Sequence, residues 1–296
     1  MGKTIEENSP IIIFTNLQAM FLPYKINSYS ISCLPKIKAL SENYAKDFQE
    51  CNDTIKKEST KIVKSQAING TELQELWFPV DKLGEFDVFI SHSHSDIDNL
   101  VVPFASWLYS HLGLRCFIDS QFWQYADDLL KILDKELAWQ DESKTYNYKI
   151  RNFTSSNIHI MLSMALMKMM NKTETVIFID SDNSVKYKKE DGETTPSPWI
   201  YEEVNFAKSL ESKLPDRWLQ YLKPELEKGL IYEERRFSDR RRPNIYYKID
   251  ISNFFRLNSG FLKQLSQNGK RGDNAMDAMH IENLSRFKND RWHING

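Results

Sequence analysis

The sequence predicts an α/β protein built on an open, mainly parallel sheet. Three short apolar runs, at 88–90, 114–119 and 175–180, have the composition of strands that are covered on both faces. Helical patterns lie between them, and a strand, a helix and a second strand of these lengths form a right-handed crossover. Each run is followed by polar side chains. Ligands of such sheets bind beyond the carboxyl ends of the strands, so the candidate site is expected there.

Residues 1–80 are predicted to form a mainly helical N-terminal extension. The first 40 residues hold apolar patches broken by prolines, without periodicity, and are expected to be irregular. From 41 to 67 the apolar residues follow a four-then-three spacing, which is typical of a helix with a narrow apolar seam. Two partners suit this seam: the following domain, or another helix in an oligomer.

Residues 81–296 are predicted to form the sheet domain. A helix is expected from 97 to 112. Gly113 follows it at the C-terminal cap, where glycine is common because the backbone adopts the left-handed conformation. Because Pro103 lies inside this range, its first turn should be bent or should start late. The second strand leads into a loop rich in aromatic residues and then into a helix at 129–139.

A polar insertion at 140–155 precedes the most apolar helix, which is expected at 156–172. Its isoleucine, leucine and methionine residues cover most of the circumference, so the helix is predicted to be buried. The methionines suit a gap-filling role in the core, although an oligomer interface would use the same residues. A polar loop at 181–195 follows the third strand. The next helix then begins with Ser197 as its cap and Pro198 in its first position.

The C-terminal part is expected to contribute a strand at 244–251 and helices at 259–267 and 273–287. A further strand at 230–232 is a weaker candidate. Between this candidate and the strand at 244–251 lies a basic cluster in a predicted loop. We favour a solvated turn for it over phosphate or partner binding. The cluster consists of Arg235, Arg236, Arg240, Arg241 and Arg242.

The bulk properties point to a cytoplasmic globular protein. The 296 residues are 41% hydrophobic and 27% charged, which allows a large core, and the net charge of -2 gives no general attraction to nucleic acid or to an anionic membrane. The three cysteines are an odd number without the spacing of metal ligands, so reduced thiols are expected. Polar residues interrupt the apolar stretch at 11–22, which excludes a convincing signal peptide or membrane span.

Two features could carry chemistry. His92 and His94 would face one side of a strand, a geometry that can hold a metal, but no third ligand is evident nearby and no metal is predicted. On the helix that begins at Pro198, a step of about 100° per residue puts Glu203 on the apolar face. A buried carboxylate needs an ion-pair partner or a task, and Trp199 one turn earlier offers the flat apolar wall of a site.

Three segments of the sequence stand out together: Phe-Asp-Val-Phe-Ile-Ser-His-Ser-His-Ser-Asp at 86–96, Phe-Ile-Asp at 117–119, and Ser-Pro-Trp at 197–199 with Glu203 four residues later. They resemble the conserved boxes of the Toll/interleukin receptor (TIR) domain family. Their spacing is similar to that of bacterial members. The resemblance covers about 81–265 and leaves the first 80 residues outside.

The resemblance implies a flavodoxin-like sheet with helices on both faces and, for the enzymatic branch, cleavage of NAD as a substrate, without a cofactor. The family's catalytic glutamate falls on Glu203 and its tryptophan on Trp199. The family's substrate-binding positions fall on two groups after the first and second strands. They are Ser91, His92 and Ser93, and then Asp119, Trp123 and Tyr125. The second group lacks the glycine that the family commonly has in this loop, and the insertion at 140–155 is longer than usual.

The expected reaction releases nicotinamide and an ADP-ribose or cyclic ADP-ribose product, in antiphage defence signalling. One carboxylate suffices, because nicotinamide leaves NAD as a neutral molecule. The resemblance also implies homo-oligomers formed by TIR–TIR contacts and an upstream sensor or downstream effector protein. The alternative is a non-enzymatic TIR adaptor that acts through homotypic contacts. A carboxylate at position 203 on the apolar face favours the enzyme.

Overall fold

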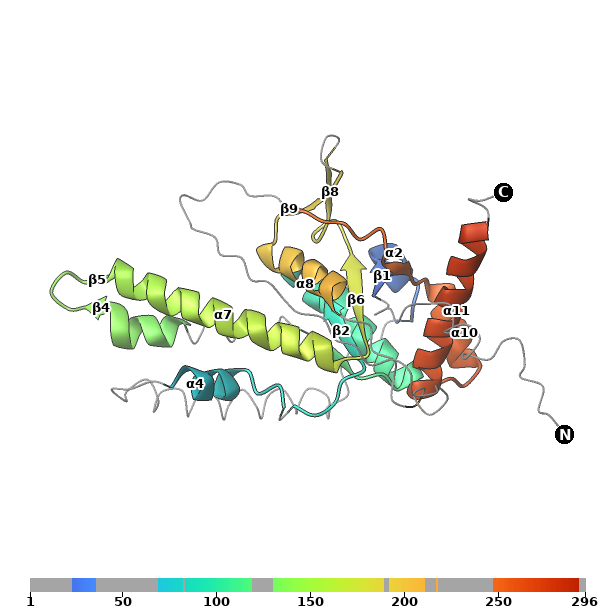
Figure 1. Ribbon diagram of the computed structural model, residues 1–296, viewed down its shortest axis with the longest axis horizontal. Coiled ribbons are helices and arrows are strands. Elements are labelled where there is room, and N and C mark those ends of the chain that lie inside the picture. The colour runs from blue at the N-terminus through green and yellow to red at the C-terminus, as the bar shows by residue number, and fades with distance from the viewer. Residues whose placement is uncertain are drawn as a thin grey trace, which may run out of the picture.

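The computed structural model describes residues 23–35, 69–81, 83–118, 130–188, 192–210, 217 and 247–292. Their centre is a five-stranded sheet in which every neighbouring pair is parallel, so the predicted open parallel α/β fold is confirmed (Figure 1). Across the sheet the order is β10 (Phe255–Arg256), β1 (Tyr24–Asn27), β6 (Thr175–Asp180), β2 (Val88–Ser91) and β3 (Cys116–Ile118).

The strand order changes direction between β2 and β6. From β2 the chain first adds β3 on one side and then crosses to β6 on the other. The loops that leave the carboxyl ends of these two strands therefore diverge, and open sheets of this type bind ligands at such a point.

Strand β1 comes from the segment that the sequence predicted to be irregular, so this prediction was wrong for Tyr24–Asn27. The strand lies between β6 and β10, with Tyr24 opposite both Ile177 and Phe255. Tyr24 and Ile26 are fully buried. Four residues directly after a proline are too few for a periodic signal, and tertiary pairing makes them a strand. One strand of the sheet thus lies before residue 81, the predicted start of the sheet domain.

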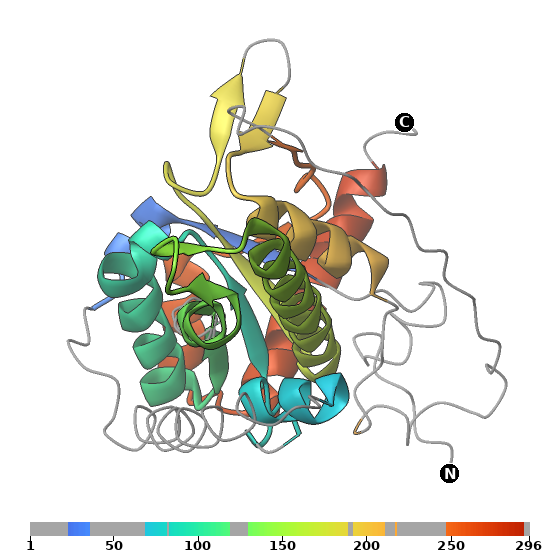
Figure 2. The ribbon, with the colours of Figure 1, turned by 90° about the vertical axis from the view of Figure 1, so that its left-hand side faces the viewer.

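Helices cover both faces of the sheet, because alternate strand residues point to opposite sides (Figure 2). On one face Phe89, Val176 and Phe178 pack with α4 (Gly70–Trp77), α7 (Tyr148–Lys172) and α8 (Pro198–Ser209). The opposite face has its own helical layer. It consists of α2 (Ser28–Ser32), α5 (Val102–Trp107), α10 (Ser259–Gln267) and α11 (Asp273–Trp292), which pack with Val88, Ile90, Ile177 and Ile179.

The helix after β2 begins irregularly, as Pro103 predicted. A π-helical segment, η2 (Ile97–Val101), precedes α5, and a second one, η3 (Leu108–Leu112), follows it. Gly113 ends the helix in the left-handed region with φ of 69°. A side chain at this position would be strained, which explains the glycine.

Helix α7 is longer and more exposed than the sequence predicted. The predicted insertion forms a hairpin of β4 (Trp139–Gln140) and β5 (Thr145–Tyr146), and Asn147 then caps the helix by accepting from the backbone of Lys149 and Ile150. The prediction of burial all round was wrong, since Ile160 is 61% exposed. Within the described residues, α4, α8 and η4 (Asp134–Ala138) contact α7 and bury only part of its circumference. None of the described helices is long and apolar enough to span a membrane.

The C-terminal elements differ from the prediction mainly in their strands. The expected last strand shrinks to β9 (Tyr247–Lys248), which joins β7 (Lys186–Lys188) and β8 (Gly192–Thr195) in a small antiparallel sheet. The sequence missed β10, a two-residue strand, whereas α10 has the predicted bounds and α11 continues to Trp292. The predicted helices at 41–67 and at the start of 129–139, the strand candidate at 230–232 and the arginine cluster fall wholly or partly outside the described residues.

An ion-pair cluster at the amino end of β6 should make stability fall in acid. Arg217 donates to both carboxylate oxygens of Glu174, at 2.7 and 2.8 Å, and His280 Nε2 donates to Oε1 at 3.0 Å. Burial alone would raise the pKa of Glu174, but these hydrogen bonds outweigh it and lower the pKa from 4.5 to about 2. Because the folded pKa is the lower one, the contribution is present above pH 4.5 and is lost as the pH falls towards 2.

We expect this carboxylate to contribute about 2–3 kcal/mol to the pH dependence of unfolding. Urea unfolding at several pH values between 5 and 2 measures how steeply the free energy of unfolding falls with pH. Arg217→Gln should make this fall smaller, because a neutral glutamine does not favour the ionised form of Glu174. An unchanged slope in the variant would contradict this assignment.

Candidate functional site

The candidate site is built around a contact between β2 and α8. Ser91 is the last residue of β2. Helix α8 starts where predicted, with the Ser197 side chain accepting from the backbone of Ile200, and its first turn sets which residues face the sheet. Glu203 then points inward and is 2% exposed. Ser91 Oγ donates to Glu203 Oε2 at 2.6 Å, so two predicted site residues far apart in sequence meet at the β2–β6 switch point.

A second carboxylate joins the loops that leave β2 and β6. Asp96 is 4% exposed and accepts from Ser181 Oγ through one carboxylate oxygen and from Asn183 Nδ2, at 2.7 Å, through the other. Ser181 and Asn183 are not among the predicted site residues, although they follow β6, which ends at the same edge of the sheet as β2. These bonds fix the two loops relative to each other at the edge of the sheet where β2 and β6 end.

The two histidines of the first motif lie in different environments. His92 is buried, and its Nδ1 lies 3.0 Å from the carbonyl oxygen of Ile90. Since a carbonyl only accepts, Nδ1 carries the proton and the bond fixes the ring against its own strand. His94 is exposed and Ser93 is half-buried. No cluster of three possible metal ligands occurs in the part of the chain that the structure describes.

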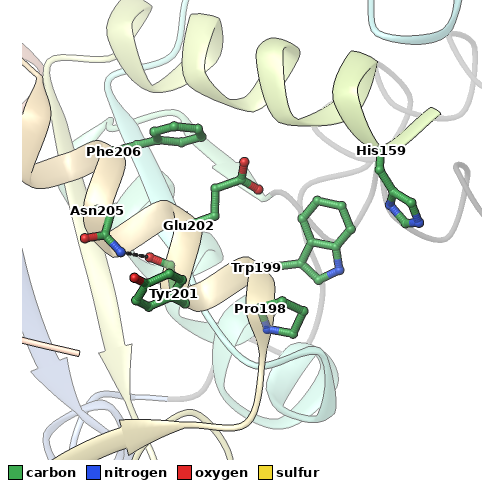
Figure 3. A pocket seen from close by; sticks show the side chains of 7 residues that line it. All are labelled: His159, Pro198, Trp199, Tyr201, Glu202, Asn205 and Phe206. Carbon is green, nitrogen blue, oxygen red and sulfur yellow. Dashed lines mark hydrogen bonds between the residues drawn. The ribbon is translucent and has the colours of Figure 1, made fainter. Parts of the chain in front are cut away.

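Trp199 faces a cavity between α7 and α8. Its ring lies 5.2 Å from that of His159, at an angle of 39° (Figure 3). The cavity measures about 660 Å³. It is mostly aromatic, and its lining consists of His159, Pro198, Trp199, Tyr201, Glu202, Asn205 and Phe206. The tryptophan is therefore one turn from Glu203 but lies on the α7 side of it.

Helix α8 thus directs two neighbouring carboxylates to different places. Glu202 points towards α7 (Figure 3). There Ser163 Oγ donates to Glu202 Oε1. Burial raises the pKa of Glu202, and the Ser163 hydrogen bond opposes this effect in part. Glu203 lies on the sheet side. Of these two carboxylates, it is Glu203 that accepts a hydrogen bond from the first motif, from Ser91.

Three predicted substrate-binding residues, Asp119, Trp123 and Tyr125, lie outside the described residues. The structure therefore brings together Ser91 and Glu203, with His92 next to them along the chain, and places Trp199 on the neighbouring cavity. No family model matches the chain, and neither a curated protein nor a solved structure matches it.

The contact between Ser91 and Glu203 should also stabilise the fold. Ser91→Ala removes the donor and leaves a buried carboxylate oxygen with one hydrogen bond fewer, which typically costs about 1–3 kcal/mol. We expect the free energy of unfolding in urea to fall by this amount. Ser93→Ala is the control, because Ser93 is half-buried and two residues away, and its change should stay below about 0.5 kcal/mol. A similar loss in both variants would argue against a special role for the pair.

Proposed function

We propose that the chain is a TIR-type NAD nucleosidase that cleaves the bond between nicotinamide and ribose. The observation that carries the proposal is the 2.6 Å hydrogen bond between Ser91 and Glu203. It joins the first motif to the motif glutamate at the carboxyl edge of a parallel sheet, where the strand order reverses.

The sheet order supports a flavodoxin-like assignment with one substitution. From β3 the order is β3, β2, β6, β1 and β10, so the first three places follow the 2-1-3 pattern of that fold. The fourth place belongs to β1, which comes from before the first motif. We infer that an N-terminal strand replaces the one that usually follows β6 in the chain.

The chemistry that we assign to Glu203 is electrostatic. The ring nitrogen of NAD is cationic, so when its bond to the ribose carbon breaks, the electron pair moves to nitrogen and nicotinamide leaves neutral. Positive charge develops on the ribose. A carboxylate held in a place that excludes water stabilises that charge more than it would in bulk solvent. Water then attacks the ribose carbon and loses a proton, or a group of the substrate itself attacks and closes a ring.

Ser91 indicates how the ribose would be held. Its hydroxyl donates to Glu203 Oε2, which is the contact that a ribose hydroxyl would make. In our proposal a ribose hydroxyl of the substrate replaces Ser91 as the donor to Glu203. The Ser91 hydroxyl then rotates and donates to another oxygen atom of the ribose. Because Glu203 is buried, substrate binding requires the side chains around it to move apart.

The deciding experiment is nicotinamide release from NAD by the purified full chain, followed by chromatography over a range of protein concentrations. We expect release, with a rate per molecule that rises with concentration if TIR–TIR assembly completes the site. Linear and cyclic products are separated in the same run. If no nicotinamide forms at any concentration while the protein forms filaments, the adaptor alternative is correct and the enzyme proposal fails.

A further inference from the structure

Helix α7 carries an exposed apolar seam along the side that faces away from the sheet. Phe153 is 71% exposed, Ile160 61%, Met164 45% and Met167 37%. At 100° per residue these four residues fall within about 60° of one another around the helix. Isolated exposed apolar residues are ordinary, but a continuous line of them over several turns marks an interaction surface.

The seam has the spacing of a coiled-coil helix. The positions alternate by three and four residues, so that one set corresponds to heptad position a and the other to position d. The a set is Ile150, Asn157 and Met164, and the d set is Phe153, Ile160 and Met167. A polar asparagine at one a position is the usual device that fixes register between paired helices. The spacing therefore favours a helical partner over a strand or an extended peptide.

The charge of α7 specifies that partner further. The helix contains Lys149, Arg151, Lys168 and Lys172 but neither aspartate nor glutamate. Arg151 pairs with Asp134 and Lys172 with Asp81, whereas Lys149 and Lys168 make no ion pair with the residues that the structure describes. In the heptad frame Lys149 is at position g and Lys168 at position e, which flank the seam and select partners by charge.

We propose that the seam of α7 binds an acidic amphipathic helix of another protein, with glutamate or aspartate at its flanking positions. A second α7 is a poor occupant, since two helices without carboxylates give no attractive pair at positions e and g. An anionic membrane is tested below as a different occupant. The proposal does not depend on NAD cleavage.

Two synthetic peptides test the proposal directly. Each peptide has about four heptads, with leucine and isoleucine at positions a and d and one asparagine at a position a. The peptides differ at positions e and g, where one carries glutamate and the other carries lysine. Self-repulsion keeps each peptide from pairing with itself. In fluorescence anisotropy with the full chain, we expect the glutamate peptide to bind at least tenfold more tightly than the lysine peptide, with the difference shrinking as salt is added.

Variants locate the binding on α7. Ile160→Asn together with Met164→Gln should weaken binding of the glutamate peptide at least tenfold without adding charge. Lys168→Glu should reduce the difference in affinity between the glutamate and the lysine peptide. Tyr187→Asn is the control, because this exposed residue lies in β7, away from the seam. Thermal melting confirms that each variant is folded. All of the substituted side chains are exposed, so folding should be kept.

Three results would overturn the proposal. The first is equal binding of the two peptides, or no binding of the glutamate peptide. The second is a dimer of the wild-type chain in sedimentation that the Ile160→Asn, Met164→Gln variant loses, which would make a second copy the occupant. The third is co-sedimentation with phosphatidylserine vesicles that the same variant loses, which would assign the seam to a membrane.

Discussion

Glu203→Gln should lower the rate of nicotinamide release by about 10³-fold or more, with a much smaller change in the KM for NAD. Glutamine keeps the size of the side chain and can still accept from Ser91, so the fold and the ground-state contacts survive. It lacks the negative charge that opposes the developing charge on the ribose, and a lost electrostatic contact of this kind costs about 10²–10³ in kcat. We expect the loss to reach or exceed the upper end of this range because we assign the stabilisation of the ribose charge to Glu203 alone.

Glu202→Gln is the matched comparison for this experiment. It removes a negative charge one residue away on the same helix, but the Glu202 carboxylate points to Ser163 and the α7–α8 cavity. We expect its effect on kcat to stay below about tenfold. Initial rates by chromatography, together with thermal melting of both variants, measure the contrast. Similar losses in the two variants would move the catalytic assignment away from Glu203.

Phe178→Ala should be the most damaging core substitution, with a loss of about 3–5 kcal/mol in the free energy of unfolding. Phe178 is fully buried in the middle of β6, the central strand of the sheet, and its ring meets the edge of Phe254 at a centroid distance of 6.4 Å. Alanine would leave a cavity between the sheet and the helical layer that holds α8. Because β6 pairs on both sides, the surrounding strands cannot move in to fill it.

Phe153→Ala removes the same atoms at a site that is 71% exposed. Its effect should stay within about 0.5 kcal/mol. Urea unfolding of the two variants beside the wild type gives the comparison, provided that the slope with denaturant is unchanged. If both variants lose several kcal/mol, then α7 is covered in solution and the seam described above is part of a core.

The sequence was informative where apolar runs were long or where end signals were strong. Strand β6 has the predicted bounds because six consecutive residues suit a doubly covered strand. Helix α8 begins as predicted because its cap and its proline are local signals. Strands β1 and β10 were missed, since short segments become strands only through their neighbours. The burial of α7 was overestimated because composition alone does not show how many elements pack around a helix.

The site was predictable to a similar degree. The inward position of Glu203 followed from counting 100° steps along a helix whose start was known. Its contact with Ser91 required the sheet order, which the resemblance implied and periodicity alone does not give. The bonds of Ser181 and Asn183 to Asp96 depend on the course of a loop, for which the sequence holds only the presence of polar residues.

The place of β1 in the sheet bears on how the protein can be shortened and how it is made. Tyr24 pairs with Ile177 and Phe255, so β1 is synthesised long before the strands with which it pairs. A fragment that starts at residue 81, the predicted start of the sheet domain, would lack this strand and leave two parallel edges open to other chains. Expression boundaries chosen from the motifs alone should therefore yield an aggregating protein, whereas a start before residue 23 keeps all five described strands of the sheet.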